Sequence, residues 1–201
     1  VRSLAELLMS LLTLPETSTA STTLLRKPDS LRVRLAAGEA ERVVKLADGR
    51  LIDSDEIEPP DGSAGALRHP RLDLITYPYE WTFSMLRDAA LLQLDLLEGA
   101  LSAGLTIKDA TPYNIQFVDG RPVFIDIGSF ETYRTGEPWI GYRQFTRQFL
   151  FPLMLRAWVG VPFQPWLRGD LEGPTASQMS KLLAGRKRFN TSALLHVRLQ
   201  A

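Results

Sequence analysis

The strongest hydrophobic pattern in the chain lies in residues 84–104, where apolar positions recur at intervals of three and four. The positions that define its main face are Met85, Ala89, Leu92 and Leu96. This period is that of an amphipathic helix with a broad buried face. Ser84 is a suitable N-cap, and Gly104 is suitably placed to follow the last helical turn. The pattern therefore predicts a helix over about residues 85–102.

The residues before this helix carry weaker patterns. Leucines at helical spacing in residues 4–11 predict an amphipathic helix, although the run could also belong to a secretion signal. Residues 15–30 are rich in Ser, Thr and Pro, which is typical of a linker. Residues 36–52 fit either a helix that stops at Gly49 or a β-hairpin that turns at Asp48-Gly49, and we favour the helix.

Three further elements are expected around and after the long helix. Residues 72–77 predict a short strand that Pro78 ends. Residues 139–160 have apolar positions in helical phase, with a kink or break expected at Pro152. Proline and glycine residues mark 162–173 as loop, and Thr175 is the expected N-cap of a helix over 176–184.

A tight hairpin with polar residues at its ends stands between these helices. Ile115–Val118 and Pro122–Ile125 are β-rich runs joined by Asp119-Gly120-Arg121. Because the strands of a hairpin are antiparallel, the residues at its open end, Asn114 and Asp126, should be neighbours in space. Asp109 is expected to loop back towards them. Carboxylate and amide oxygens suit a hard cation such as Mg²⁺, so the pattern predicts a metal site.

Simpler interpretations exist for each candidate residue. Asp and Asn are common in loops because their side chains bond to nearby backbone groups. The aromatic segment from Tyr77 to Trp81 could hold an adenine ring or could be core packing. Arg143 and Arg147 are one helical turn apart and could grip a phosphate, but we favour pairing with local acidic residues.

Composition narrows the classes of protein further. The chain has 201 residues, 45% hydrophobic and 23% charged, as expected for one globular domain. Its 23 basic and 23 acidic residues give a net charge of zero, which argues against a nucleic-acid-binding domain. There is no cysteine, and the two histidines are far apart, so no zinc site is expected. No apolar run is long enough to cross a membrane, and we expect a cytoplasmic protein.

The spacing of the polar residues resembles the catalytic core of the protein-kinase-like superfamily. Asp109 to Asn114 is D-x-x-x-x-N, Asp126 to Gly128 is D-x-G after a hairpin, and a long helix precedes both. Within that superfamily, the pattern is most similar to that of the small-molecule branches, the aminoglycoside phosphotransferases and their relatives. The resemblance implies an α+β fold with a mostly helical, kinase-like C-lobe, a catalytic-loop hairpin, and a reduced or absent N-lobe.

This resemblance also implies roles for individual residues. Asp109 would accept the proton of the attacking hydroxyl, while Asn114 and Asp126 would hold Mg²⁺ with ATP. Lys45, Tyr77 and Lys108 would contact the nucleotide. The sequence departs from the pattern in having Ile107-Lys108 where kinases have His-Arg, and in lacking an upstream G-x-G-x-x-G loop. A small-molecule phosphotransferase and a pseudokinase that binds nucleotide both remain open.

The expected organisation follows from this interpretation. Residues 1–30 would form an N-terminal helix and linker, and residues 31–201 a kinase-like domain. Within that domain, residues 31–80 would be the reduced N-lobe and residues 81–201 the helical lobe.

A second resemblance covers roughly residues 68–201. Its motifs are HPRLDLITYPYEWTFSMLRDAALLQLDLLEGAL, GLTIKDATPYNIQFVDGRPVFIDIGSFE and EPWIGYRQFTRQFLFPLMLRA. They are similar to the N-terminal region of a bacterial family of class I S-adenosylmethionine-dependent methyltransferases, some of them nodulation-protein-like. In that family the methyltransferase domain lies downstream, and this sequence has no glycine-rich turn of the S-adenosylmethionine type. The resemblance implies a non-catalytic substrate-binding or scaffolding module whose partner is a methyltransferase domain.

Overall fold

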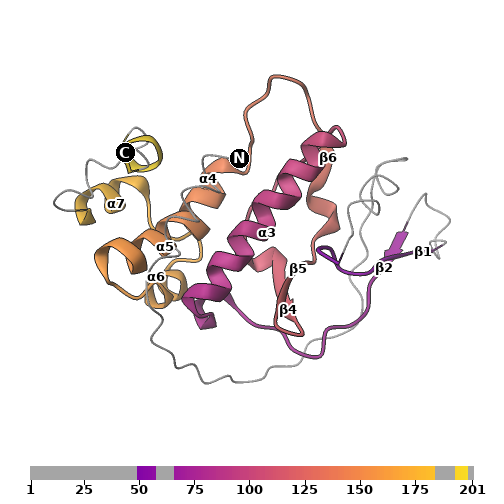
Figure 1. Ribbon diagram of the computed structural model, residues 1–201, viewed down its shortest axis with the longest axis horizontal. Helices are drawn as coiled ribbons and strands as arrows, with labels where there is room; N and C mark the ends of the chain where they lie inside the picture. The colour runs from indigo at the N-terminus through magenta and orange to yellow at the C-terminus, as the bar shows by residue number, and fades with distance from the viewer. Residues whose placement is uncertain (1–48, 58–65, 184–192, 199–201) are drawn as a thin grey trace.

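The computed structural model describes residues 49–57, 66–183 and 193–198 of the chain (Figure 1). The predicted N-terminal helix, the Ser/Thr/Pro-rich linker and Lys45 lie outside the described residues. The helix-or-hairpin alternative for residues 36–52 lies mostly outside them as well. Gly49 is described, and its φ of 71° is left-handed, which suits a turn or the residue after a helix.

Helix α3 (Phe83–Ser102) runs through the middle of the described residues, as predicted (Figure 1). Its N-cap is Thr82 rather than Ser84: the Thr82 hydroxyl accepts a hydrogen bond of 3.2 Å from the Met85 amide. Thr82 has the extended backbone that an N-cap needs, whereas Ser84 already lies in the first helical turn. Gly104 follows the helix with a φ of 73°, as expected.

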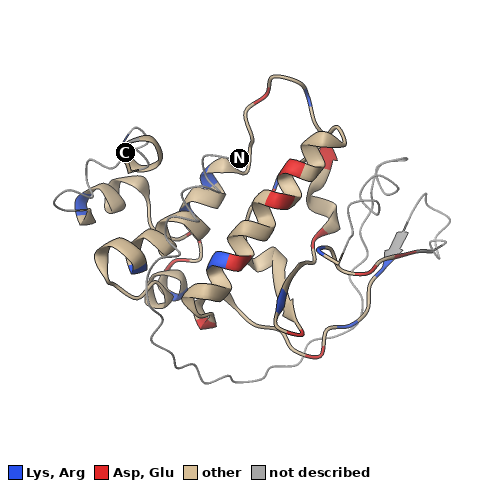
Figure 2. Ribbon diagram, in the orientation of Figure 1, with Lys and Arg blue, Asp and Glu red and all other residues tan. Residues whose placement is uncertain are grey.

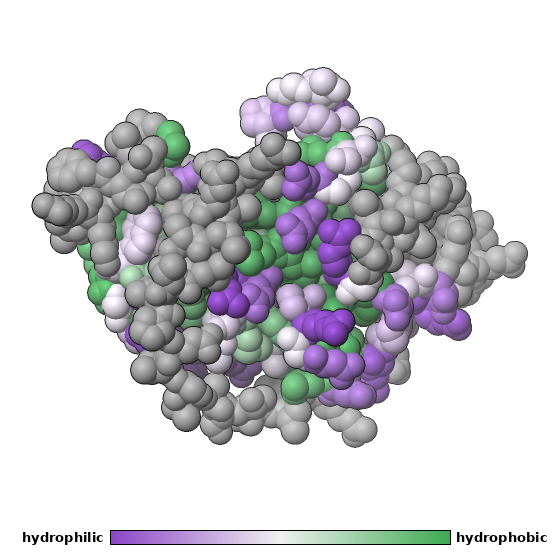
Figure 3. All heavy atoms as spheres, in the orientation of Figure 1, coloured by the Kyte–Doolittle hydropathy of each residue, from purple (hydrophilic) through white to green (hydrophobic). Residues whose placement is uncertain are grey.

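Both faces of α3 match the sequence pattern. Its buried side is formed by Leu86, Ala89, Ala90, Leu92, Gln93, Leu94, Leu96, Leu97 and Ala100. Acidic residues recur along its other side, where Asp95 and Glu98 are exposed (Figure 2). On the face drawn in Figure 3, hydrophilic and hydrophobic residues lie side by side near the centre of the view. Burial of the apolar side is what holds the helix in place, since each fully buried leucine contributes about 1.5–3 kcal/mol.

The described strands form three two-stranded antiparallel sheets. The pairs are β1 (Asp55–Ile57) with β2 (Ala66–Arg68), β3 (Leu105–Ile107) with β6 (Phe130–Thr132), and β4 (Ile115–Val118) with β5 (Arg121–Phe124). The β4–β5 hairpin is the predicted one, and Asp119 and Gly120 both have positive φ, as a type I′ turn requires. The β3–β6 pair was not predicted, because each strand has only three residues.

The segment before β1 adds to the hairpin. Leu51 forms a parallel bridge with Phe124, and hydrogen bonds of 2.9 Å join the backbone of Arg50 and Ile52 to Phe124. β5 is therefore bonded on both sides, to β4 and to this short extended segment.

The strand predicted over residues 72–77 is absent. The structure has irregular chain there, with a bend at Asp73, followed by the short 3₁₀ turn η2 (Pro78–Glu80). The backbone of Thr76 bonds instead to the side chain of Gln116, which accepts from the Thr76 amide at 2.9 Å and donates to its carbonyl at 3.0 Å. A buried side-chain amide thus replaces the neighbouring strand that the pattern suggested.

The predicted helical region after residue 139 is present, but its hydrogen bonding changes along its length. It consists of α4 (Tyr142–Phe145), η5 (Thr146–Leu150), α5 (Phe151–Met154) and η6 (Leu155–Val159), of which η5 and η6 are π-helical. Pro152 therefore does not end the region. It stands directly after a π-helical turn, in the first turn of α5, where its missing N–H is tolerated. Gly160 closes the region with a φ of 79°.

Two helices follow, one of which was not predicted. α6 (Gln164–Gly169) occupies part of the stretch expected to be loop, because Pro165 stands in its first turn, a position that favours proline. α7 (Ala176–Leu182) is the predicted helix with Thr175 as N-cap. The π-helical turn η8 (Leu194–Arg198) packs against α7.

The described residues share one hydrophobic core between α3, the small sheets and the helices after residue 139. Phe145 and Phe149 are fully buried in it, and Trp158 packs against it partly exposed. The fold is mixed α and β, as the sequence indicated. Among the described helices, none has the length and apolar character that a membrane span needs.

Candidate functional site

The open end of the β4–β5 hairpin brings together Asn114 and Asp126, as predicted. The Asn114 amide nitrogen donates to Asp126 Oδ2 at 3.1 Å. Ser129, which the sequence analysis did not single out, donates to the same oxygen at 2.6 Å and is fully buried. The Asn114 amide also lies 3.3 Å from the Ser129 hydroxyl. The three side chains form a closed hydrogen-bonded cluster, here called the Asn114 cluster.

Backbone pairing fixes this cluster in place. The Ile125 amide donates to the Asn114 carbonyl at 2.9 Å, which extends the hairpin to the cluster. The Lys108 amide donates to the Ser129 carbonyl at 2.9 Å, which extends the β3–β6 pair in the same direction. Because both small sheets converge here, residues far apart in the chain meet with little freedom to separate.

The other predicted site residues that the structure describes are not part of the cluster. Asp109 is half-buried, and its carboxylate has no hydrogen bond or ion pair within the described part of the chain. Lys108 is exposed. Tyr77 stacks on Tyr79 with ring centroids 5.4 Å apart and planes nearly parallel, at 3°.

Three side chains from residues 139–148 hold the loop that carries Asp109. The Ala110 amide donates to Gln144 Oε1 at 2.8 Å, and the Trp139 indole donates to the Ile107 carbonyl at 2.7 Å. The Thr111 hydroxyl donates to Gln148, which is almost fully buried. Gln144 and Gln148 are one helical turn apart in the sequence. That spacing was visible in the sequence, but only the fold shows that both side chains reach the loop.

The aromatic segment before α3 divides between core and surface. Trp81 is buried and donates its indole N–H to the Thr76 hydroxyl at 2.8 Å, so its role is structural. Tyr77 and Tyr79 remain half-exposed. Burial raises the pKa of Tyr113 to about 12, with smaller contributions from Tyr79 and Glu172. The Tyr113 hydroxyl is shielded from solvent and has no hydrogen-bond partner among the residues that the structure describes.

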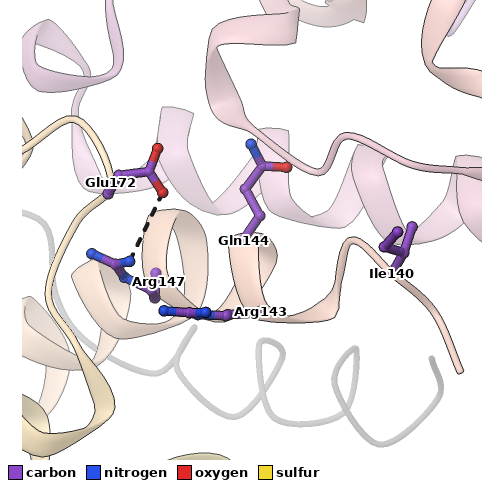
Figure 4. A pocket seen from close by; sticks show the side chains of 5 residues that line it. All are labelled: Ile140, Arg143, Gln144, Arg147 and Glu172. Atoms are coloured by element: carbon purple, nitrogen blue, oxygen red, sulfur yellow. Dashed lines mark ion pairs between the residues drawn. The ribbon is translucent and has the colours of Figure 1, made fainter.

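Arg143 and Arg147 have different surroundings. Arg147 is largely buried, donates to the Gly173 carbonyl at 2.9 Å, and lies 3.8 and 3.9 Å from carboxylate oxygens of Asp170 and Glu172. This agrees with the predicted pairing to local acids. Arg143 is exposed and has no ion pair among the residues that the structure describes. Together with Ile140, Gln144 and Glu172, the two arginines line a pocket of about 330 Å³ (Figure 4).

The Asn114 cluster offers few ligands for a metal ion. In the described ranges, no group of three or more His, Cys, Asp or Glu side chains could hold one. Asp126 Oδ1 and Asn114 Oδ1 have no hydrogen-bond partner in the described part of the chain, and both are oxygen ligands of the kind that Mg²⁺ prefers. A Mg²⁺ ion held here would take most of its coordination from water and from the phosphates of a nucleotide, which is common for this cation.

Comparison with known proteins finds no family model that matches the chain. The chain is similar to the nodulation protein NoeA of Rhizobium meliloti (strain 1021), with 42% identity over 186 residues. The similarity covers 89% of this chain but only 39% of NoeA. The predicted resemblance to nodulation proteins is therefore confirmed, and the chain spans about two fifths of the length of this relative.

Proposed function

We propose that this chain is a non-catalytic, ligand-holding or scaffolding module of a longer protein. Its partner would be a methyltransferase domain that lies outside residues 1–201. The observation that carries this proposal is the relationship with NoeA, which extends over nearly the whole chain but over a minor part of the relative. The similarity to the N-terminal region of S-adenosylmethionine-dependent methyltransferases supports the same interpretation.

The fold is compatible with such a module. The described residues have their own hydrophobic core, as a domain within a longer chain would. The loop of Asp109 is also held by buried side-chain hydrogen bonds from Gln144 and Gln148, so it presents a fixed surface. A rigid surface lowers the ordering cost of binding, which favours a role in holding a ligand.

The test compares the longer protein with a form that lacks residues 1–201. Transfer of tritium from S-[methyl-³H]adenosylmethionine to an extract of the source bacterium measures methylation, and calorimetry measures S-adenosylmethionine binding. We expect the deletion to abolish transfer and to leave S-adenosylmethionine binding intact. Equal transfer with and without residues 1–201 would refute the proposal.

A second candidate function is binding of Mg²⁺ and a nucleotide by a kinase-like fold. The observation that favours it is the contact between Asn114 and Asp126 at the end of a hairpin, preceded by a long helix. In this interpretation Asn114 and Asp126 would hold Mg²⁺. The nucleotide would be contacted by Tyr77, Lys108 and Lys45. Asp109 would accept a proton from the acceptor. A bound Mg²⁺ would neutralise phosphate charge, the main electrostatic requirement of phosphoryl transfer.

Titration of Mg-ATP into the full chain by calorimetry tests this second function. We expect binding by the wild type and a loss of at least about tenfold in Asp126→Asn, because one charge-assisted ligand is removed. Asp119→Asn is the matched control: it makes the same change at the other end of the same hairpin, where Asn tolerates the positive φ. Asp109→Asn should keep binding while abolishing any phosphoryl transfer. Absence of heat with the wild type would exclude this function.

A further inference from the structure

One pocket of the structure, here called the Arg143 pocket, is rich in hydrogen-bond donors (Figure 4). It is lined by Ile140, Arg143, Gln144, Arg147 and Glu172. Arg143 is exposed and, within the described ranges, its guanidinium has no ion pair or hydrogen bond. Gln144 uses its Oε1 to accept from the Ala110 amide, which leaves its Nε2 donors available. Arg147 contributes a second guanidinium.

Acceptors in the same pocket are few. Glu172 is the acidic side chain in its lining, and its carboxylate is already 3.9 Å from Arg147. Arg147 already lies 3.8 Å from Asp170 and 3.9 Å from Glu172, whereas Arg143 has no ion pair within the described ranges. An anion bound at Arg143 would use the planar fork by which arginine binds oxyanions.

We infer that the Arg143 pocket binds an anionic oxygen group of a ligand, either a tetrahedral oxyanion such as phosphate or sulfate, or a carboxylate. Ile140, which is 71% exposed, supplies an apolar edge to the pocket and would contact the uncharged part of the ligand. Binding of the anion to Arg143 is the main interaction, and Gln144 adds a donor beside it.

The pocket adjoins the loop of Asp109. Gln144 lines the pocket and also binds the Ala110 amide, one residue after Asp109. A ligand anchored at Arg143 would therefore lie next to this loop. This inference gives the chemical class of the ligand that the proposed module holds, and in that sense it rests on the proposed function.

Nuclear magnetic resonance of the ¹⁵N-labelled full chain tests the inference directly. The arginine side-chain and glutamine amide signals are followed while sodium phosphate, sodium sulfate or sodium acetate is added at constant ionic strength. We expect saturable shifts of the Arg143 and Gln144 signals, and binding at least about tenfold weaker in Arg143→Gln. Arg156→Gln is the matched control, because Arg156 is an exposed arginine of the same helical region outside the pocket.

Saturation by phosphate or sulfate alone would assign a tetrahedral oxyanion, and equal saturation by acetate would assign a carboxylate. The inference is overturned if none of the three anions gives a saturable shift. It is equally overturned if Arg143→Gln and Arg156→Gln weaken binding alike, since that would indicate general attraction to positive charge. The anion titration and the comparison of the two arginine variants do not depend on methyl transfer. Failure of this inference is therefore distinguishable from failure of the proposed function.

Discussion

Removal of the Ser129 hydroxyl should weaken the Asn114 cluster by a predictable amount. In the wild type this hydroxyl donates to Asp126 Oδ2 at 2.6 Å, and Ser129 is fully buried. A hydrogen bond to a charged group is worth about 1.5–3 kcal/mol. Asp126 is partly exposed, so water can replace some of this interaction, and we expect Ser129→Ala to cost about 1–2 kcal/mol.

The two donors to Asp126 should also compensate for each other. After Ser129→Ala the carboxylate still has the Asn114 amide at 3.1 Å, and after Asn114→Ala it still has the serine hydroxyl. The double variant leaves no side-chain donor to Asp126 in the cluster. We therefore expect its loss of stability to exceed the sum of the single losses by about 0.5 kcal/mol or more.

Urea unfolding followed by circular dichroism measures these differences, with unchanged slopes showing that the denatured state is comparable. Ser102→Ala is the control, because its exposed hydroxyl donates to the carbonyl of Glu98 in its own helix. We expect this control to change stability by less than about 0.5 kcal/mol. A Ser129→Ala loss no larger than that of the control would show that the cluster does not stabilise the hairpin end. Strict additivity in the double variant would show that the two donors act independently.

Three further predictions concern residues outside the cluster. Gly173→Ala should lower the free energy of unfolding in urea by roughly 2 kcal/mol or more, because Gly173 has a φ of 69° and a Cβ there would collide with a main-chain carbonyl. The control is Gly169→Ala, where a Cβ would meet open space, and it should be neutral or stabilising. Gln116→Leu should lower the free energy of unfolding by about 1–3 kcal/mol and speed hydrogen exchange of the Thr76 amide, because the backbone groups of Thr76 lose their partners. An unchanged exchange rate at Thr76 would contradict this prediction. Burial lowers the pKa of His196 below 6.5, so the unfolded chain binds a proton at this histidine at higher pH than the folded chain does. The free energy of unfolding should therefore fall as the pH drops from 6.5 towards the pKa of the folded state. This fall should be smaller in His196→Gln.

Elements with strong local signals were predictable from the amino-acid sequence. The 3.6-residue apolar period predicted α3, because its buried face recurs over about four turns, from Leu86 to Ala100. Asp119-Gly120 fixed the hairpin, because a type I′ turn needs two residues that accept positive φ. The convergence of Asn114 and Asp126 then followed from antiparallel geometry alone.

Local signals were weaker elsewhere, and some predictions there were wrong. Thr82 and Ser84 both carry cap hydroxyls, and only the direction in which the chain enters α3 decides between them. Residues 72–77 have the composition of a strand, but the structure gives the backbone of Thr76 a side-chain partner instead of a neighbouring strand. The β3–β6 pair joins three-residue segments that are far apart in sequence, so no local pattern predicts it.

Only the tertiary structure decided which side chains support the site. Ser129 completes the Asn114 cluster because the β3–β6 pair returns the chain to the hairpin end. Gln144 and Gln148 reach the loop of Asp109 because the helical region after residue 139 packs against it. These contacts join residues separated by up to 37 positions, and such separations are set by packing of the whole core rather than by any short stretch of sequence.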